Sequence, residues 1–162
     1  RSRNKRWIGL DRKYKGKSRW DQDITESGYK YHMNNINAAI GLRNMSYIDE
    51  IIGDHMRNRT YYDEHITNPK ITKMRRPDHT VSSSWIYSIL TEDRENLKSY
   101  LADHGIASDR VHVRNDQYSV FGGKDESLKN LNEFDSKLLN IPVGWWVEKD
   151  QAAQIAKVLN IF

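Results

Sequence analysis

The sequence contains no cysteine, only three prolines and no long apolar run, and each absence excludes a class of protein. Without cysteine there are no disulfides, no thiolate nucleophile and no cysteine ligands for zinc or iron–sulfur clusters. This composition fits a reducing compartment, so we expect a cytoplasmic protein. No stretch approaches the roughly 18 consecutive apolar residues of a membrane helix. The first residues are not followed by the apolar core of a signal peptide, so we expect neither a membrane partner nor secretion.

Common catalytic motifs are missing as well. The sequence has no G-x-x-x-x-G-K, G-x-G-x-x-G, H-E-x-x-H or G-x-S-x-G. Their absence argues against a nucleotidase, a dinucleotide-dependent dehydrogenase, a zinc protease and a serine hydrolase. The six histidines are scattered without the spacing of converging ligands, so we expect no metal site.

The residues that are present indicate one folded domain with an uneven charge. The 162 residues include five Trp, nine Tyr and three Phe, enough for a hydrophobic core. Residues 1–19 hold nine basic residues and one acidic residue, a net charge of +8, and the rest therefore sums to −4 because the whole chain is +4. This arm, with Trp7, Tyr14 and Trp20 between its charges, is suited to nucleic acid or a phosphate-bearing ligand. A solvated connector fits the same pattern.

Hydrophobic periodicity predicts helices that alternate with short strands. Apolar residues four or eight positions apart predict a long amphipathic helix over residues 34–66, which could break at Gly41 or Gly53. We also expect strands over 82–90, near 110–113 and over 138–143, and helices over 93–105, 126–134 and 152–159. The chain therefore reads as an α/β or α+β sandwich, with the long helix against a small sheet or leading into it.

A first polar group directly precedes the predicted long helix and consists of Lys30, His32 and Asn34. The start of a helix favours anions, because its first amides are unpaired and the helix dipole is positive there. A phosphate is the ligand that this pattern predicts. The alternative is that Asn34 and Asn35 only cap the helix.

A second polar group follows the middle of the chain and consists of His112, Arg114, Asn115 and Asp116. A cation, an amide and a carboxylate within one loop are suited to bind a sugar or a diphosphate. The alternative is a surface loop in which Asn and Asp side chains form local turns.

Several motifs resemble those of a known enzyme family. Residues 6–12 read R-W-I-G-L-D-R, and residues 20–42 read W-D-Q-D-I-T-E-S-G-Y-K-Y-H-M-N-N-I-N-A-A-I-G-L. Further on stand W-I-Y at 85–87, V-H-V-R-N-D at 111–116 and L-N-I-P-V at 139–143. Together these motifs resemble the DegT/DnrJ-type family of pyridoxal-phosphate-dependent sugar aminotransferases, and the resemblance covers nearly the whole chain.

The resemblance implies the C-terminal small domain of such an enzyme. Residues 1–33 would be a basic extended connector from a large domain that is missing here, and residues 34–162 a single small domain. The implied fold is α+β, with a small, mostly antiparallel sheet, a long N-terminal helix and shorter helices, as in fold-type I pyridoxal-phosphate transferases. The lysine that carries the cofactor belongs to the large domain, so we expect no catalytic residue and no bound cofactor in this chain alone. A first residue that is Arg rather than Met fits a part of a longer protein.

For the intact enzyme the resemblance implies pyridoxal 5′-phosphate as cofactor, glutamate as amino donor, a homodimer, and a nucleotide-linked keto-deoxysugar of polysaccharide biosynthesis as substrate. It assigns contact with the cofactor phosphate to Lys30, His32 and Asn34, and contact with the substrate to His112, Arg114, Asn115 and Asp116. A non-catalytic module that holds nucleic acid on its basic arm is the alternative, and nucleic acid is the less favoured partner.

Overall fold

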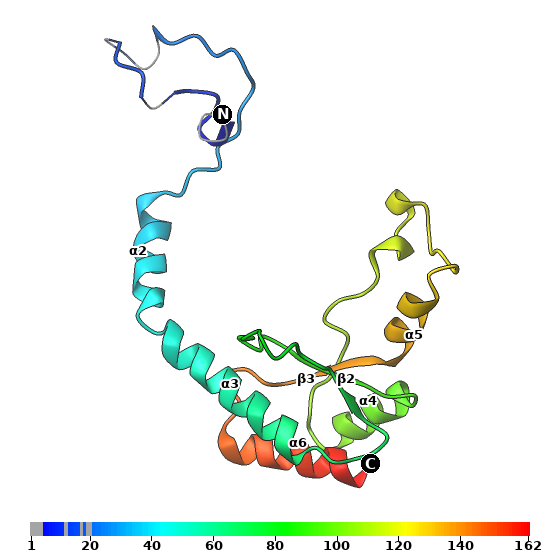
Figure 1. Cartoon of the computed structure of the whole chain (residues 1–162). Coiled ribbons are helices and arrows are strands. Elements are labelled where there is room, and N and C mark those ends of the chain that lie inside the picture. The colour runs from blue at the N-terminus through cyan, green and yellow to red at the C-terminus, as the bar shows by residue number, and fades with distance from the viewer. Residues whose placement is uncertain (1–4, 12, 17, 19–20) are drawn as a thin grey trace. The chain divides into compact units, whose positions relative to one another are not determined.

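A computed structural model of the chain (Figure 1) describes residues 5–11, 13–16, 18 and 21–162. Several residues of the predicted basic arm lie outside the described residues: Arg1, Arg3, Arg12, Lys17, Arg19 and Trp20. The chain divides into two compact units, residues 1–47 and residues 48–162. The structural boundary thus follows Tyr47, and the assignment of residues 1–33 to a connector and 34–162 to a small domain stays a prediction. No helix of the described residues has the length and apolar character to cross a membrane.

In the first unit, the segment around Trp7 runs antiparallel to the segment around Lys30. The two residues form a β-bridge, and the amide of Ile8 donates to the carbonyl of Tyr29 at 3.0 Å. Gly28 makes the close approach possible, because a Cβ there would lie 2.2 Å from a backbone nitrogen of the opposite segment. This pairing fixes the chain immediately before helix α2 (Asn35–Met45).

The predicted helix over 34–66 is in fact two helices, α2 and α3 (Ile48–His65). The break falls at Ser46 and Tyr47, so the expectation of a break at a glycine is wrong. The Ser46 hydroxyl donates to the carbonyl of Arg43 at 2.7 Å, and such a contact competes with the helical backbone pattern. Gly41 and Gly53 lie inside their helices, where glycine is costly but tolerated.

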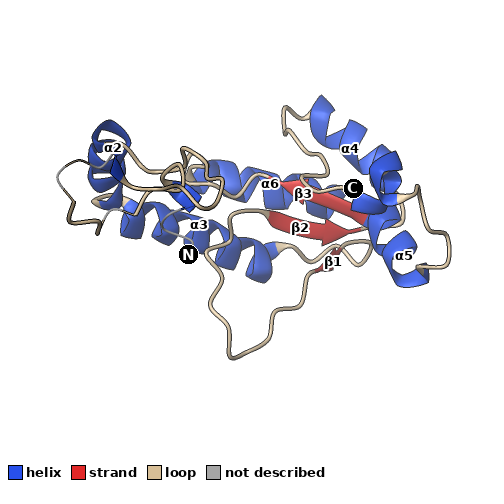
Figure 2. Cartoon of the chain, turned by 90° about the horizontal axis from the view of Figure 1, so that it is seen from above, coloured by secondary structure: helices blue, strands red, loops and turns tan. Residues whose placement is uncertain are grey.

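Among the described residues, the second unit is built on a three-stranded antiparallel sheet in the order β1, β2, β3. Its strands are β1 (Thr72–Lys73), β2 (Tyr87–Leu90) and β3 (Leu138–Ile141), and its α-helices besides α3 are α4 (Arg94–Asp103), α5 (Lys129–Lys137) and α6 (Lys149–Ile161). Helices α3 and α6 lie side by side (Figures 1 and 2). The expected α+β fold with a small antiparallel sheet is confirmed.

The hydrophobic core of the second unit lies between the sheet and helices α3, α4 and α6. Its most deeply buried side chains are Tyr62, Tyr87, Ile89, Leu97, Leu101, Leu139 and Leu159. Two tyrosine hydroxyls in the core keep hydrogen-bond partners: Tyr62 donates to the carbonyl of Pro142 at 2.8 Å, and Tyr87 donates to Asp63 at 2.7 Å. Burial raises the pKa of both tyrosines, and the Asp63 contact raises that of Tyr87 further.

The strand predicted over 82–90 begins only at Tyr87. Alternation places Trp85 on the buried side with Tyr87 and Ile89, yet Trp85 is exposed and lies before the strand. The cause is Ser84, whose φ of +54° lies in the left-handed region and interrupts the extended backbone.

The strand expected near 110–113 is also absent from the described residues. Asp109 and Asn140 form an isolated bridge beside β3, and the pairing ends there. The amide of Arg110 donates to the Asp109 carboxylate at 2.8 Å, and that of Val111 donates to the side-chain oxygen of Asn140 at 2.8 Å and not to the β3 backbone. The hydrogen bond to the Asn140 side chain therefore takes the place of the backbone hydrogen bond that would continue a strand.

Candidate functional site

The loop that follows Asp109 is organised around the buried guanidinium of Arg114. Its Nε and Nη2 atoms donate to the two carboxylate oxygens of Asp116 at 2.7 and 2.6 Å. Nη1 donates to the side-chain oxygen of Asn132, and Nη2 also donates to the carbonyl of Asp125 at 3.1 Å. Arg114 is only 6% exposed. One planar, two-pronged cation thus joins two positions of the loop, Asp116 and Asp125, to Asn132 on helix α5, a geometry that arginine provides and lysine does not.

Asp116 is held from two sides. Besides the Arg114 pair, its Oδ2 atom accepts the amide of Asp125 at 3.0 Å. The Arg114 hydrogen bonds, followed by that amide, hold the pKa of Asp116 well below its usual range. The same pairing raises the pKa of Arg114. The two groups therefore stay ionised and neutralise one another inside the loop.

The other two predicted residues of this group face solvent. His112 and Asn115 are exposed, and Asn115 begins a 3-10 turn, Asn115–Gln117. His112 is anchored through its neighbour, because Val111 donates to Asn140, whose amide donates in turn to the Ser88 hydroxyl at 2.8 Å. The structure therefore brings the four predicted residues into one loop and separates them into an internal ion pair and two displayed side chains. Their contact with substrate stays a prediction.

The first predicted group lies at the start of α2. The ring of His32 packs edge-on against Trp7, with 3.9 Å between ring centroids, and its Nδ1 atom is buried without a hydrogen-bond partner among the described residues. Asn34 is the N-cap of α2, and its side-chain oxygen accepts the amide of Asn37 at 2.8 Å. The Lys30 side chain is exposed. The capping role is confirmed for Asn34, whereas Asn35 is the first residue of the helix, and contact with a phosphate stays a prediction.

Sequence reasoning missed Asn58, a polar residue at the centre of the second unit. Its side-chain amide nitrogen lies 3.3, 3.1 and 2.8 Å from the carbonyl oxygens of Val143, Gly144 and Val147, and the residue is 1% exposed. It therefore attaches the turn after β3 to α3. The signal was present in the helical spacing, because Asn58 lies four residues before the fully buried Tyr62.

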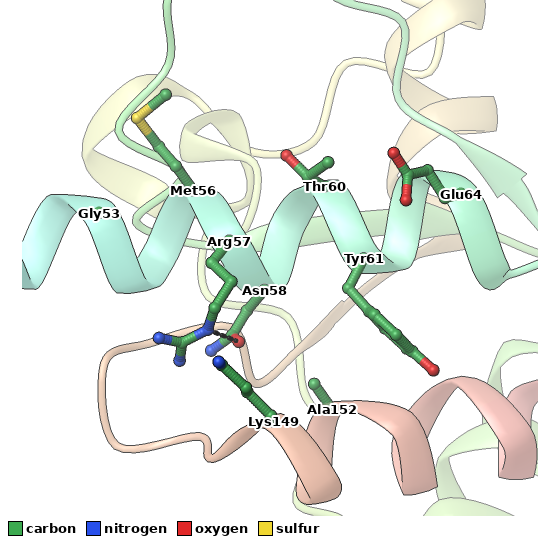
Figure 3. Close-up of a pocket in the computed structure, with 9 residues that line it drawn as sticks. All are labelled: Gly53, Met56, Arg57, Asn58, Thr60, Tyr61, Glu64, Lys149 and Ala152. Carbon is green, nitrogen blue, oxygen red and sulfur yellow. Dashed lines mark hydrogen bonds between the residues drawn. The ribbon is translucent and has the colours of Figure 1, made fainter.

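A groove of about 590 Å³ lies between α3 and α6 (Figure 3). Figure 3 shows the side chains of Arg57, Asn58 and Lys149 projecting toward the gap between the two helices. Arg57 is ion-paired with Asp54 and donates from Nε to the side-chain oxygen of Asn58 at 3.3 Å. None of the residues that line the groove belongs to either predicted group. The pairing with Asp54 neutralises the charge of Arg57 within this groove.

Comparison with solved structures shows the class of protein to which this fold belongs. The chain superposes on the crystal structure of the sugar aminotransferase CalS13 from Micromonospora echinospora with a TM-score of 0.90 and 30% identity, over 98% of this chain and 43% of that one. It superposes on AtS13 from Actinomadura melliaura with a TM-score of 0.89 and 28% identity, over 98% and 42% of the two chains. The expected likeness to pyridoxal-phosphate transferases of fold type I is confirmed.

The sequence identifies the family. Residues 3–160 match the DegT/DnrJ/EryC1/StrS aminotransferase family, and the chain belongs to it. GDP-perosamine synthase from Escherichia coli O157:H7 is 27% identical over 138 residues, which cover 83% of this chain and 38% of that protein. A dTDP-3-amino-3,6-dideoxy-alpha-D-galactopyranose transaminase from Aneurinibacillus thermoaerophilus is 23% identical over 141 residues, with coverages of 82% and 37%. The chain thus spans less than half the length of these relatives.

Proposed function

We propose that this chain is the small-domain part of a pyridoxal-phosphate-dependent aminotransferase that acts on a nucleotide-linked keto-deoxysugar in polysaccharide biosynthesis. The observation that carries the proposal is the likeness of almost the whole chain to a sugar aminotransferase, at a TM-score of 0.90 and 30% identity. The relatives named for perosamine and for an aminodideoxygalactose support the substrate class. The intact enzyme would work as a cytoplasmic homodimer with glutamate as amino donor.

In this proposal the loop around Arg114 binds the substrate through its displayed side chains. His112 and Asn115 offer hydrogen bonds to the nucleotide-linked sugar, while Arg114 and Asp116 hold them in place. Preorganising the polar contacts in this way lowers the entropy that is lost on binding. The internal pairing of Arg114 supports a positioning role for this residue and leaves the direct contacts to its neighbours.

The residues at the start of α2 fit the phosphate of the cofactor. The buried Nδ1 atom of His32 has no partner among the described residues, Lys30 adds a positive charge, and the Asn34 cap leaves first-turn amides of α2 for an anion. Pyridoxal phosphate, when bound in the intact enzyme, supplies the carbonyl group that takes up and passes on the amino group. These residues of the chain would hold its phosphate, and the lysine that carries the cofactor would come from the large domain.

The test is a titration of the isotopically labelled chain with unreactive nucleotide sugars, namely GDP-mannose, UDP-N-acetylglucosamine and dTDP-glucose. We expect amide shifts over residues 111–118 and none along the groove between α3 and α6. The variants His112→Ala and Asn115→Ala should each bind about five- to tenfold more weakly, as expected for the loss of one hydrogen bond. Asn96→Ala, an exposed change on α4, is the matched control. No shift over 111–118 at about 10 mM ligand, where even weak contacts register, would contradict the proposal.

A further inference from the structure

Trp85 displays a large aromatic surface where strand alternation predicts a core residue. It is 61% exposed, whereas Tyr87 and Ile89, its partners in the alternation, are 1% and 0% exposed. Tryptophan gains much free energy from burial, and its flat face also binds planar ligands. A tryptophan excluded from an adjacent core therefore points to a surface that binds something.

The outward turn of Trp85 is fixed from inside the domain. Ser84 adopts a φ of +54°, which is unfavourable for a residue other than glycine. Its carbonyl oxygen lies 3.0 Å from Nδ1 of His55 on α3, and both residues are buried. Strained backbone that its surroundings hold in place clusters at functional sites. The exposure of Trp85 is thus a built feature of the turn before β2.

His112 completes an aromatic pair with Trp85. The two ring centroids are 5.6 Å apart and the planes are tilted by 51°. The rings come from segments that are anchored separately, because Ser84 is held by His55 and Val111 is held by Asn140. The pair therefore forms a rigid corner open to solvent and needs little ordering when a ligand binds.

The cations beside His112 are already neutralised. Arg110 is ion-paired with Asp135 at 3.0 Å, and Arg114 is ion-paired with Asp116 at 2.6 Å. A phosphate would have to compete with these carboxylates. A planar uncharged ring would instead stack on the indole without disturbing either ion pair.

We propose that Trp85 and His112 form the stacking site for the base of the nucleotide-linked substrate. This assignment rests on the proposed function, because it presumes that a nucleotide binds this domain. Every nucleobase has a π face, so stacking on tryptophan tolerates different bases. The exposed imidazole of His112 adds a hydrogen-bonding group at the edge of the base. Trp85 is thus a substrate-binding residue that recognises the base, while Asn115 faces the sugar or diphosphate.

The test measures binding of GDP, UDP and glucose 1-phosphate to the chain by calorimetry and ligand-observed NMR. We expect Trp85→Ala to weaken GDP and UDP binding about tenfold or more, which is about 1.4 kcal/mol, whereas Trp85→Phe keeps most of the affinity because its ring still stacks. Trp145→Ala removes a tryptophan of similar exposure, 54%, and serves as the matched control with unchanged affinity. Glucose 1-phosphate, which has no base, should bind the parent chain and Trp85→Ala alike. Circular dichroism and urea unfolding confirm that each variant is folded.

Three results would overturn the stacking site, and the first two leave the proposed function standing. If nucleotides bind the parent chain and Trp85→Ala equally, the stacking site is wrong and the proposed function stands. If binding of glucose 1-phosphate also depends on Trp85, the platform holds the sugar and the assignment to the base is wrong. If neither nucleotide nor nucleotide sugar binds the parent chain, both proposals fail together.

Discussion

Arg114 shows how the polar groups of a binding motif can be satisfied by the protein itself. The sequence places a cation, an amide and a carboxylate within three positions, which is the chemistry of sugar and diphosphate recognition. In the folded chain the guanidinium is taken up by Asp116, by the carbonyl of Asp125 and by Asn132, which is 18 residues away. A sequence pattern identifies which groups are available for binding. It does not identify those that the loop itself will use, because this depends on contacts between distant positions.

The ion pair of Asp116 makes the loop sensitive to acid. Because the pKa of Asp116 is lower in the folded chain than in the unfolded chain, the unfolded chain binds the proton more readily. The contribution to stability is therefore complete above about pH 4, the ordinary range of aspartate, and is lost as the pH falls below it. We expect urea unfolding midpoints to drop between pH 6 and about pH 3 for the parent chain, and less steeply for Asp116→Asn.

Asp78→Asn, which changes an exposed aspartate away from this loop, is the control and should retain the acid dependence of the parent. Equal acid dependence in the parent chain and in Asp116→Asn would show that the pair does not stabilise the fold.

At the scale of elements, local patterns identified most helices and failed where a side chain replaced a backbone contact. The helix predicted over 93–105 is observed as α4, and the final helix as α6, because each carries a clear apolar stripe and Gly105 follows the end of α4. The strand expected near 110–113 is prevented by the side chain of Asn140, and the helix over 34–66 is divided at Ser46. The two-residue strand β1 is too short to have a periodic pattern.

The candidate sites also divide into features set by neighbouring residues, which the sequence predicts, and features set by distant contacts, which it does not. The chemistry of neighbouring polar residues identified both candidate groups, and motif resemblance identified the family, because in both cases the residues are close together in the sequence. The exposed position of Trp85 was missed because it depends on the φ angle of Ser84. The structural role of Asn58 was missed because its side chain binds carbonyls that lie 85 to 89 residues away. Such contacts exist only once the chain has folded.

Two glycines of the second unit differ in backbone conformation, one after the end of a helix and one inside a helix. Gly105 follows α4 with a φ of +73°, whereas Gly53 lies inside α3, and at both positions a Cβ would meet no atom within 4 Å among the described residues. Only backbone conformation therefore distinguishes the two substitutions. We expect Gly105→Ala to lower the free energy of unfolding by about 1–2 kcal/mol, since alanine disfavours the left-handed region. Gly53→Ala should raise it by about 0.5–1 kcal/mol.

Urea unfolding of both variants measures these changes, and each variant is the control for the other. If both substitutions change stability in the same direction, backbone conformation is not what sets their effect.

At the scale of the whole molecule, α2 presents an apolar surface that the other described residues of the first unit do not cover. None of the α2 residues, all of which the structure describes, is buried. Its large apolar side chains are 56–76% exposed: Ile36, Ile40, Leu42 and Met45. A surface helix of a folded protein normally buries such side chains against a neighbour. A second copy of this chain would supply such a neighbour.

We expect the isolated chain to use a second copy and to self-associate. Because exposed apolar surface favours association, light scattering after size-exclusion chromatography should give a mass of at least twice 19.1 kDa that rises with concentration. Ile36 and Ile40 lie four residues apart on one side of α2, so changing both to lysine should shift the chain toward monomer. Asn37→Lys combined with Asn44→Lys adds the same charge to the same helix without removing apolar surface, and this control should still associate. A monomeric parent chain at every concentration, or equal dissociation of both double variants, would show that apolar contact through α2 does not drive association.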